Sequence, residues 1–212
     1  MLALTEPALV KTRSFINGQW QAAGPHRFAV VNPANGKTLA QVDEATLADA
    51  TMAVEAAAAA QPGWAALAAA ERAAVLIEWQ QLLLQHEADL ALLLTLEQGK
   101  PLAEARAEIR YGASYLGWFA EEAKRLYGDI IPAPASDKQI LVLRQAVGVV
   151  TAITPWNFPN AMLMRKAAAA LAAGCSFVVK PAAQTPLSAL ACAELAQRAG
   201  VPAGIFNVLV GT

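Results

Sequence analysis

The stretch VGVVTAITPWNFP, residues 147–159, decides the fold. Its first half is rich in β-branched residues, which favour a buried strand, and the two prolines after it end that strand. Outward from it, the sequence predicts a helix over 159–174, a strand over 176–179, a helix over 185–200 and a strand over 206–210. Short strands that alternate with helices indicate an α/β fold with a parallel β-α-β-α-β sheet.

The residues before this region predict hairpins and long helices. Asn17-Gly18 is a strong two-residue turn signal, so we expect a hairpin over 15–20. Two more strands are expected at 28–31 and 38–42. Helices are expected from Thr46 to about Ala60, from about 69 to 98, and from 101 to 128, each bounded by glycine or proline.

Proline and then a strand-like run at 139–144 suggest that residues 130–145 form an arm. We therefore divide the chain into three parts. Residues 1–128 form an amino-terminal part with hairpins and helices, 129–146 form the arm, and 147–212 form the first part of the parallel sheet.

Composition excludes several classes of protein. The 212 residues are 56% hydrophobic and 16% charged, so the chain can bury a core and is not disordered. A net charge of −1 gives no basic surface for nucleic acid. No apolar leader occurs in residues 1–15, and Arg165 and Lys166 interrupt the apolar stretch 161–179, so neither a signal peptide nor a membrane span is expected. Cys175 and Cys192 lie in apolar stretches and suit a reducing cytoplasm.

Ligands of parallel sheets bind beyond the carboxyl ends of the strands, which indicates residues 154–158 and 180–185. Two prolines hold Asn157 in the first loop, so its carboxamide could donate to a developing oxyanion, or it could cap the next helix, which spacing alone favours. Lys180 could bind a ribose hydroxyl or a phosphate, or could be a solvated lysine. Arg165 could form an internal ion pair, extend to solvent, or bind a substrate carboxylate.

Other catalytic patterns do not occur. The sequence has no Gly-x-Gly-x-x-Gly, no P-loop, no Ser-His-Asp set and no cluster of metal ligands, and His26 and His86 are isolated. We therefore expect no metal site.

Four stretches are distinctive: Pro155-Trp156-Asn157-Phe158-Pro159, Lys180-Pro181-Ala182, the run 96–104 and the run 118–122. Together they resemble the aldehyde dehydrogenase superfamily, and within it most closely the NAD(P)-dependent succinate-semialdehyde dehydrogenase group. The resemblance covers nearly the whole chain and implies an amino-terminal portion of the family fold, with an incomplete Rossmann-type sheet. It implies oxidation of succinic semialdehyde to succinate, with glutarate semialdehyde as another candidate substrate.

The resemblance also implies roles for individual residues. Asn157 would donate to the oxyanion, and Arg165 would contact the substrate carboxylate. The arm would serve oligomerisation, which implies a homo-oligomer of the complete fold. The residues implied to line the aldehyde tunnel are Phe158 and Met162. Those implied to bind the cofactor are Ile153, Thr154, Pro155, Trp156, Asn157, Lys180, Pro181, Ala182 and Ala183.

Two departures from the family pattern matter. Ala183 stands where relatives often have glutamate, which suits NAD, or serine, which suits NADP. The cofactor is therefore NADP or NAD, with NADP favoured because the most similar group uses it. The resemblance also implies that the catalytic cysteine, the general-base glutamate and the catalytic domain come later than this chain. We therefore keep an inactive nucleotide-binding fragment or an interaction fragment as the alternative.

Overall fold

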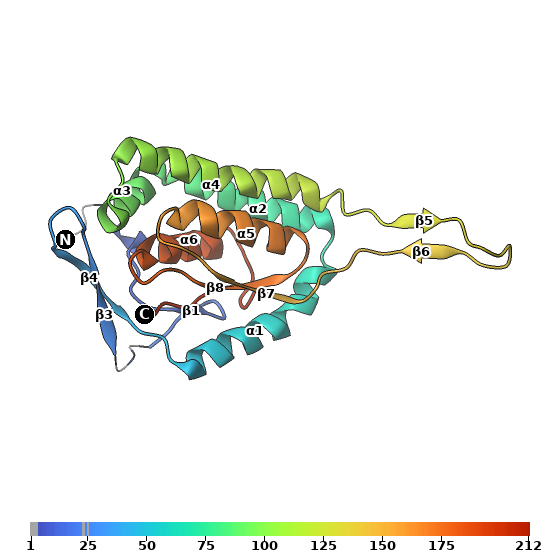
Figure 1. The fold of residues 1–212 in the computed structure, drawn as a ribbon, viewed down its shortest axis with the longest axis horizontal. Helices are drawn as coiled ribbons and strands as arrows, with labels where there is room; N and C mark the ends of the chain where they lie inside the picture. The colour runs from blue at the N-terminus through green and yellow to red at the C-terminus, as the bar shows by residue number, and fades with distance from the viewer. Residues whose placement is uncertain (1–3, 23, 25) are drawn as a thin grey trace.

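The computed structural model describes residues 4–22, 24 and 26–212, and it has a layered α/β architecture (Figure 1). One mixed sheet lies at the centre. Helix α1 (Leu47–Ala66) packs on one face, and helices α5 (Pro159–Ala172) and α6 (Pro186–Arg198) pack on the other. Outside α5 and α6 lies a further layer, formed by α2 (Ala69–Gln85), α3 (Glu87–Gln98) and α4 (Leu102–Ala123). A short 3-10 helix, η1 (Pro7–Leu9), precedes the sheet.

The central sheet has five strands in the order β2-β1-β9-β8-β7. Its parallel part was predicted from the sequence and is confirmed: β7 (Val149–Ile153) pairs with β8 (Ser176–Lys180), which pairs with β9 (Phe206–Val208). The prediction of three sheet strands was incomplete. The hairpin of β1 (Phe15–Ile16) and β2 (Gln19–Trp20) joins the sheet, because β1 pairs antiparallel with β9.

Long-range hydrogen bonds fix the hairpin to the far end of the chain. Asn17 and Gly18 have positive φ values of 52° and 72°, as the two central residues of a type I′ turn require. The backbone N–H of Asn17 donates to the side chain of Asn207 at 2.9 Å, and the backbone N–H of Val210 donates to Ser14 Oγ at 3.1 Å. The predicted hairpin is therefore confirmed, and its partner strand lies near the end of the chain.

Strand β7 is not the buried strand that its sequence predicted. It forms one edge of the sheet, and Ile153 is 81% exposed. Strand β8 is buried because it has a parallel neighbour on each side and helices on both faces. A β-branched run thus identified a strand correctly but did not show whether that strand lies inside the sheet or at its edge.

Two antiparallel ribbons lie outside the central sheet. Strands β3 (Arg27–Val31) and β4 (Thr38–Asp43) form one of them, as predicted. Strands β5 (Asp129–Ile131) and β6 (Ile140–Val142) form the other, which extends away from the helices as a long arm (Figure 1). The predicted arm is therefore present, and its role in oligomerisation stays a prediction.

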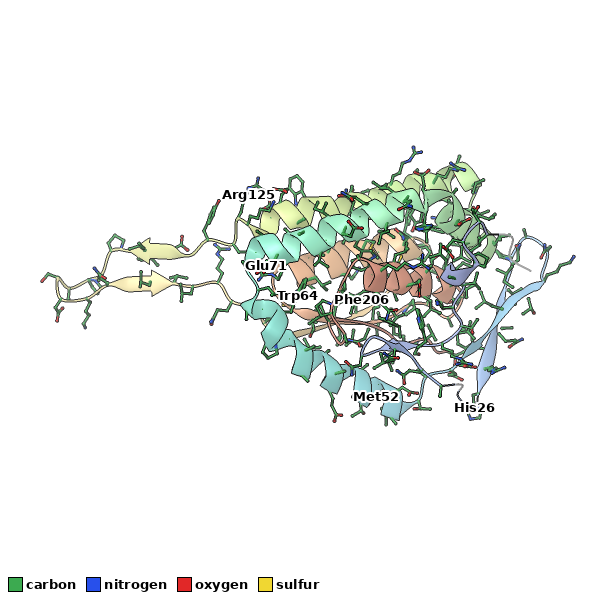
Figure 2. The ribbon with its side chains drawn as sticks, turned by 180° about the vertical axis from the view of Figure 1, so that it is seen from behind. His26, Met52, Trp64, Glu71, Arg125 and Phe206 are labelled. Carbon is green, nitrogen blue, oxygen red and sulfur yellow. The ribbon has the colours of Figure 1, made fainter. Side chains whose placement is uncertain are left out.

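Helix α1 starts as predicted and ends later than predicted. Thr46 and Asp49 form a capping box, in which each side chain accepts from the other residue's backbone N–H. The helix continues through Pro62 to Ala66, although a proline inside a helix removes one backbone hydrogen bond. Trp64 offsets this loss, because it is 2% exposed and its Nε1 donates to the carbonyl of Leu171 at 2.9 Å (Figure 2).

The single helix predicted over 69–98 is two helices. The chain turns at His86, whose φ of −97° and ψ of 17° lie outside the helical region, so α3 can pack against α6. Gly99, with φ of 94°, ends α3 in the left-handed conformation that the sequence predicted. Helix α4 ends at Ala123, five residues before the predicted end.

The core lies between the sheet and the two layers of helices on one of its faces. Trp79 of α2 meets Phe206 of β9 edge-on at 5.0 Å between ring centroids, and Phe177 stacks on Phe206 at 6.0 Å between ring centroids. Within the described residues, no helix is long and apolar enough to cross a membrane. The division of the chain into three parts stays a prediction, and strands from the first and the third part share the central sheet.

Candidate active site at the carboxyl ends of the strands

The two loops indicated by the sequence lie side by side. Ile153 and Lys180 are register partners at the ends of β7 and β8, and the backbone N–H of Thr154 donates to the carbonyl of Lys180 at 3.1 Å. Thr154 is buried, and its hydroxyl has no partner in the described part of the chain. Both loops therefore leave the sheet at the same edge, where parallel α/β sheets bind ligands.

Asn157 lies at the exposed tip of the first loop. Pro155, Trp156 and Asn157 are all exposed, whereas Pro159 is buried at the start of α5. The capping role considered for Asn157 does not occur, because Phe158 occupies the N-cap position and no side chain of that residue caps the helix. Among residues 4–22, 24 and 26–212, the Asn157 carboxamide has no hydrogen-bond partner, so it is free to donate to a ligand.

Two buried charged residues that sequence reasoning missed lie beneath this loop. The Lys100 ammonium contacts Glu108 Oε2 at 2.5 Å and donates to the Asn157 carbonyl at 2.9 Å. The other Glu108 oxygen accepts from the backbone N–H groups of Asn160 and Ala161 at 2.9 and 3.1 Å. Glu108 thus caps α5 from α4. Lys100 was seen only as part of a helix stop, and no local signal marks Glu108.

A second buried carboxylate caps the neighbouring helix in the same way. Glu97 of α3 accepts from the backbone N–H groups of Leu187 and Ser188, both at 2.8 Å, at the start of α6. Burial raises the pKa of Glu97 to about 7, and the nearby charge of Glu108 adds to this rise. Helices α5 and α6 are therefore both held by glutamates from the outer helical layer.

Lys180 borders a cavity of about 310 Å³. It is half-buried, and its ammonium donates to the carbonyl of Gly211 at 2.8 Å. On the same cavity, Glu44 accepts hydrogen bonds from the hydroxyl and the backbone N–H of Thr212, which lower the pKa of the Glu44 carboxyl. A cation and hydrogen-bonding groups beside a cavity can hold the hydroxyls or a phosphate of a nucleotide.

The residues after Lys180 lie close to the chain's outer ribbon. Pro181 is buried, and Ala182 and Ala183 are half-buried. Ala183 lines a second cavity of about 310 Å³ together with Phe28 and Gln184. The methyl group of Ala183 offers this cavity neither a charge nor a hydrogen bond.

The predicted tunnel residues lie on the α4 side of the site. Phe158 is 42% exposed, lies 4.1 Å from the Lys100 ammonium, and shares a hollow of about 310 Å³ with Glu104 and Tyr111. Met162 is half-buried one turn into α5. These two residues are near each other along the start of α5, and their role as a tunnel stays a prediction.

Of the three roles considered for Arg165, the structure does not show the internal ion pair among the residues that it describes. Arg165 is exposed on α5, and its guanidinium lies 5.5 Å from the centre of the Tyr115 ring on α4. It forms no ion pair with any described residue. The hydroxyl of Tyr115 donates to that of Tyr111, and this bond raises the pKa of Tyr115. An exposed guanidinium placed over an aromatic ring in this way remains free to bind an anion.

Neither cysteine is placed to act as a nucleophile. Cys175 and Cys192 are both buried and free, and burial raises the pKa of Cys192. The side-chain N–H of Asn160 donates to the sulfur of Cys192 at 3.2 Å. In the described part of the chain, no group of acidic, histidine or cysteine side chains could hold a metal ion.

Comparison with known proteins gives consistent matches. Residues 20–212 match the sequence pattern that defines the aldehyde dehydrogenase family. The chain is 54% identical to the succinate-semialdehyde dehydrogenase [NADP(+)] GabD of Escherichia coli (strain K12), and 54% identical to a 3-sulfolactaldehyde dehydrogenase of Pseudomonas putida. Each comparison covers 100% of the chain and 44% of the relative.

A solved structure shows the same fold. The crystal structure of an aldehyde dehydrogenase from Brucella melitensis biovar abortus 2308 superimposes with a TM-score of 0.98 at 51% identity. This match covers 100% of the chain and 44% of that structure. The chain therefore spans a little under half the length of the relatives that it matches.

Proposed function

Because the chain belongs to the aldehyde dehydrogenase family, we propose that it forms the cofactor-binding and oxyanion-stabilising part of an NAD(P)-dependent succinate-semialdehyde dehydrogenase. The reaction oxidises succinic semialdehyde to succinate. The observation that carries the proposal is the meeting of the Asn157 loop and Lys180 at one edge of the sheet, with the Asn157 carboxamide unpaired.

Asn157 has the chemistry that the first step requires. When a thiolate adds to an aldehyde, negative charge develops on the aldehyde oxygen, and a preorganised amide donor stabilises it by roughly 3–4 kcal/mol. The two cysteines of this chain are buried, so the proposal assigns the thiolate and the general base to the part of the family fold outside these 212 residues.

The residues beside β8 suit a nucleotide cofactor, which would accept hydride from the substrate. Lys180 supplies an ammonium next to a cavity of about 310 Å³. Three residues on, Ala183 has no carboxylate to repel a 2′-phosphate, so this position is compatible with NADP as well as NAD. The name of the Escherichia coli relative specifies NADP. Ile153, Thr154, Pro155, Trp156, Pro181 and Ala182 would complete the wall around the cofactor.

Arg165 would select aldehydes that carry an anionic group. Arg165 and Met162 both lie on α5, and Phe158 is the N-cap of that helix, so the exposed guanidinium would be within reach of a short chain that enters beside these two residues. The two curated relatives named above act on succinate semialdehyde and 3-sulfolactaldehyde, which share an anionic end. Glutarate semialdehyde fits the same description and remains a candidate substrate.

The proposal also covers assembly and location. The exposed apolar residues of the arm, among them Ile130 and Leu141, would pair with another copy of the complete fold in a cytoplasmic homo-oligomer.

The burial of both cysteines supports a second candidate, a fragment that binds nucleotide without turnover. The two candidates share the same cofactor site and differ only in catalysis.

A titration with two variants tests the cofactor site. The purified chain would be titrated with NADP and NAD while its tryptophan fluorescence is followed. We expect Lys180→Met to weaken binding about 10-fold or more, and the surface control Lys124→Met to leave it unchanged. Equal binding by the wild type and Lys180→Met, or no binding by either folded protein, would overturn the assignment.

A dehydrogenase assay tests whether the nucleophile lies outside these 212 residues. With succinic semialdehyde and either cofactor, we expect this chain alone to produce no reduced cofactor, because its thiols are buried. Turnover that Asn157→Ala reduces would mean that one of these cysteines is the nucleophile, contrary to the proposal.

A further inference from the structure

Lys100 and Glu108 form an almost fully buried ion pair. Their side chains are 9% and 1% exposed, and the two charged atoms lie 2.5 Å apart. Removing two charges from water is costly unless every hydrogen-bonding position finds a partner. A pair kept in this position therefore has to be explained by what else the two side chains bind.

Both side chains bind the loop that carries Asn157. Lys100 donates to the carbonyl of Asn157 at 2.9 Å, and its ammonium lies 4.1 Å from the centre of the Phe158 ring. Glu108 accepts from the backbone N–H groups of Asn160 and Ala161. The pair thus holds the backbone at Asn157 and again three residues later.

No other described side chain caps the start of α5 or binds the backbone carbonyl of Asn157. Helix α5 has no side-chain cap of its own, and its first free N–H groups favour a negative charge. Glu108 supplies that charge from α4, and Lys100 neutralises it. Apart from the hydrogen bond of Thr154 to Lys180 at its start, the exposed loop between β7 and α5 would otherwise be restrained mainly by its prolines, which act on their own φ and on the residue before each of them.

We propose that Lys100 and Glu108 are positioning residues for Asn157. With the Asn157 carbonyl and the start of α5 both held, the carboxamide keeps only the rotations of its own side chain, so its donor is aimed before substrate arrives. The inference rests on the proposed function, because it takes the Asn157 carboxamide as the oxyanion donor.

The test uses NMR of the full 212-residue chain without cofactor. The variants are Lys100→Met, which removes the charge, and Glu108→Gln, which keeps an oxygen for the two backbone amides. The matched control is Glu97→Gln, because Glu97 is an equally buried carboxylate that caps α6 rather than α5. The side-chain amide signals of Asn157 are assigned by their loss in Asn157→Ala.

We expect Lys100→Met to speed hydrogen exchange of the Asn160 and Ala161 amides about 10-fold or more, since a hydrogen bond to a charged group is lost nearby. The Asn157 side-chain signals should move toward the positions of an unstructured asparagine. Glu97→Gln should change the exchange rates of the Asn160 and Ala161 amides by no more than about twofold and should leave the Asn157 signals in place. It should speed exchange at the start of α6.

Unchanged exchange and unchanged Asn157 signals in a folded Lys100→Met would overturn the proposal. The proposal would also be overturned if Glu97→Gln speeds exchange of the Asn160 and Ala161 amides and moves the Asn157 signals as much as Lys100→Met does. The effect would then be general destabilisation. Glu108→Gln carries the same test if Lys100→Met does not fold. Since no cofactor is present, a failure here is independent of a failure of nucleotide binding.

Discussion

Glu97 gives a sharp test of the electrostatics of this fold. It is 2% exposed, and it accepts two backbone N–H groups at the start of α6. Burial raises the pKa of its carboxyl from an ordinary 4.5 to about 7. The perturbation is Glu97→Gln, which keeps the shape and one acceptor oxygen and removes the titration.

The sign and the size follow from linkage. Because the folded state holds the Glu97 proton more tightly than the unfolded state, its stabilising effect is fully present below about pH 4.5 and is lost as the pH rises through about 7. The shift of about 2.5 units corresponds to about 3 kcal/mol, at about 1.36 kcal/mol per unit. Glutamine does not titrate, so the variant should gain about 2 to 3 kcal/mol relative to the wild type between pH 5 and pH 8.

Urea unfolding of both proteins at pH 5, 6.5 and 8 measures this difference. Glu87→Gln, at a surface ion pair with Arg110, serves as the control and should show a much smaller pH dependence. A difference that stays constant with pH would refute the reasoning. So would a wild type that gains stability with rising pH, because the two amide donors and the helix dipole would then outweigh burial and keep Glu97 ionised.

Three further predictions concern packing. Gly204→Ala should lower the free energy of unfolding by about 2 kcal/mol or more, because φ is +82° and the new Cβ would lie 2.7 Å from a carbonyl oxygen of α1. Gly63→Ala, which has open space around it, should raise the free energy of unfolding by about 0.5–1 kcal/mol. Urea unfolding measures both changes. Trp64→Phe should cost about 1–3 kcal/mol in the same assay, since the buried Leu171 carbonyl loses its donor; a cost below about 0.5 kcal/mol would contradict this. Cys192 should react with a thiol reagent only as fast as the protein unfolds, and rapid labelling of the folded chain would count against its burial.

Local signals predicted much of the fold. The Asn17-Gly18 turn, the helix start at Thr46 and the helix end at Gly99 each depend on a few neighbouring residues, and all three occur as expected. The strand-end rule likewise brought the Asn157 loop and Lys180 to one edge. These features depend on backbone sterics and sheet geometry, which short stretches of sequence contain.

The errors occurred where distant contacts decide the outcome. Pro62 predicts the end of a helix, but the helix continues because Trp64 is anchored to α5. The chain turns at His86, between Leu83 and Leu90, whose seven-residue spacing fits one continuous helix. Lys100 and Glu108 could not be recognised from sequence, because their partners near Asn157 lie some fifty residues later and meet them only in the folded protein.

The pairing of β1 with β9 sets the order in which this protein can be completed during synthesis. Asn17 and Asn207 are 190 residues apart, so the hairpin emerges from the ribosome long before its partner strand exists. Until then β1 has only its hairpin partner β2 beside it, and Phe15 and Ile16, both buried in the folded protein, lack the rest of the central sheet. Closing such a long loop also slows folding. The hairpin therefore takes its place in the central sheet only after residues 206–208 have been synthesised, so β1 completes its pairing late in the folding of this region.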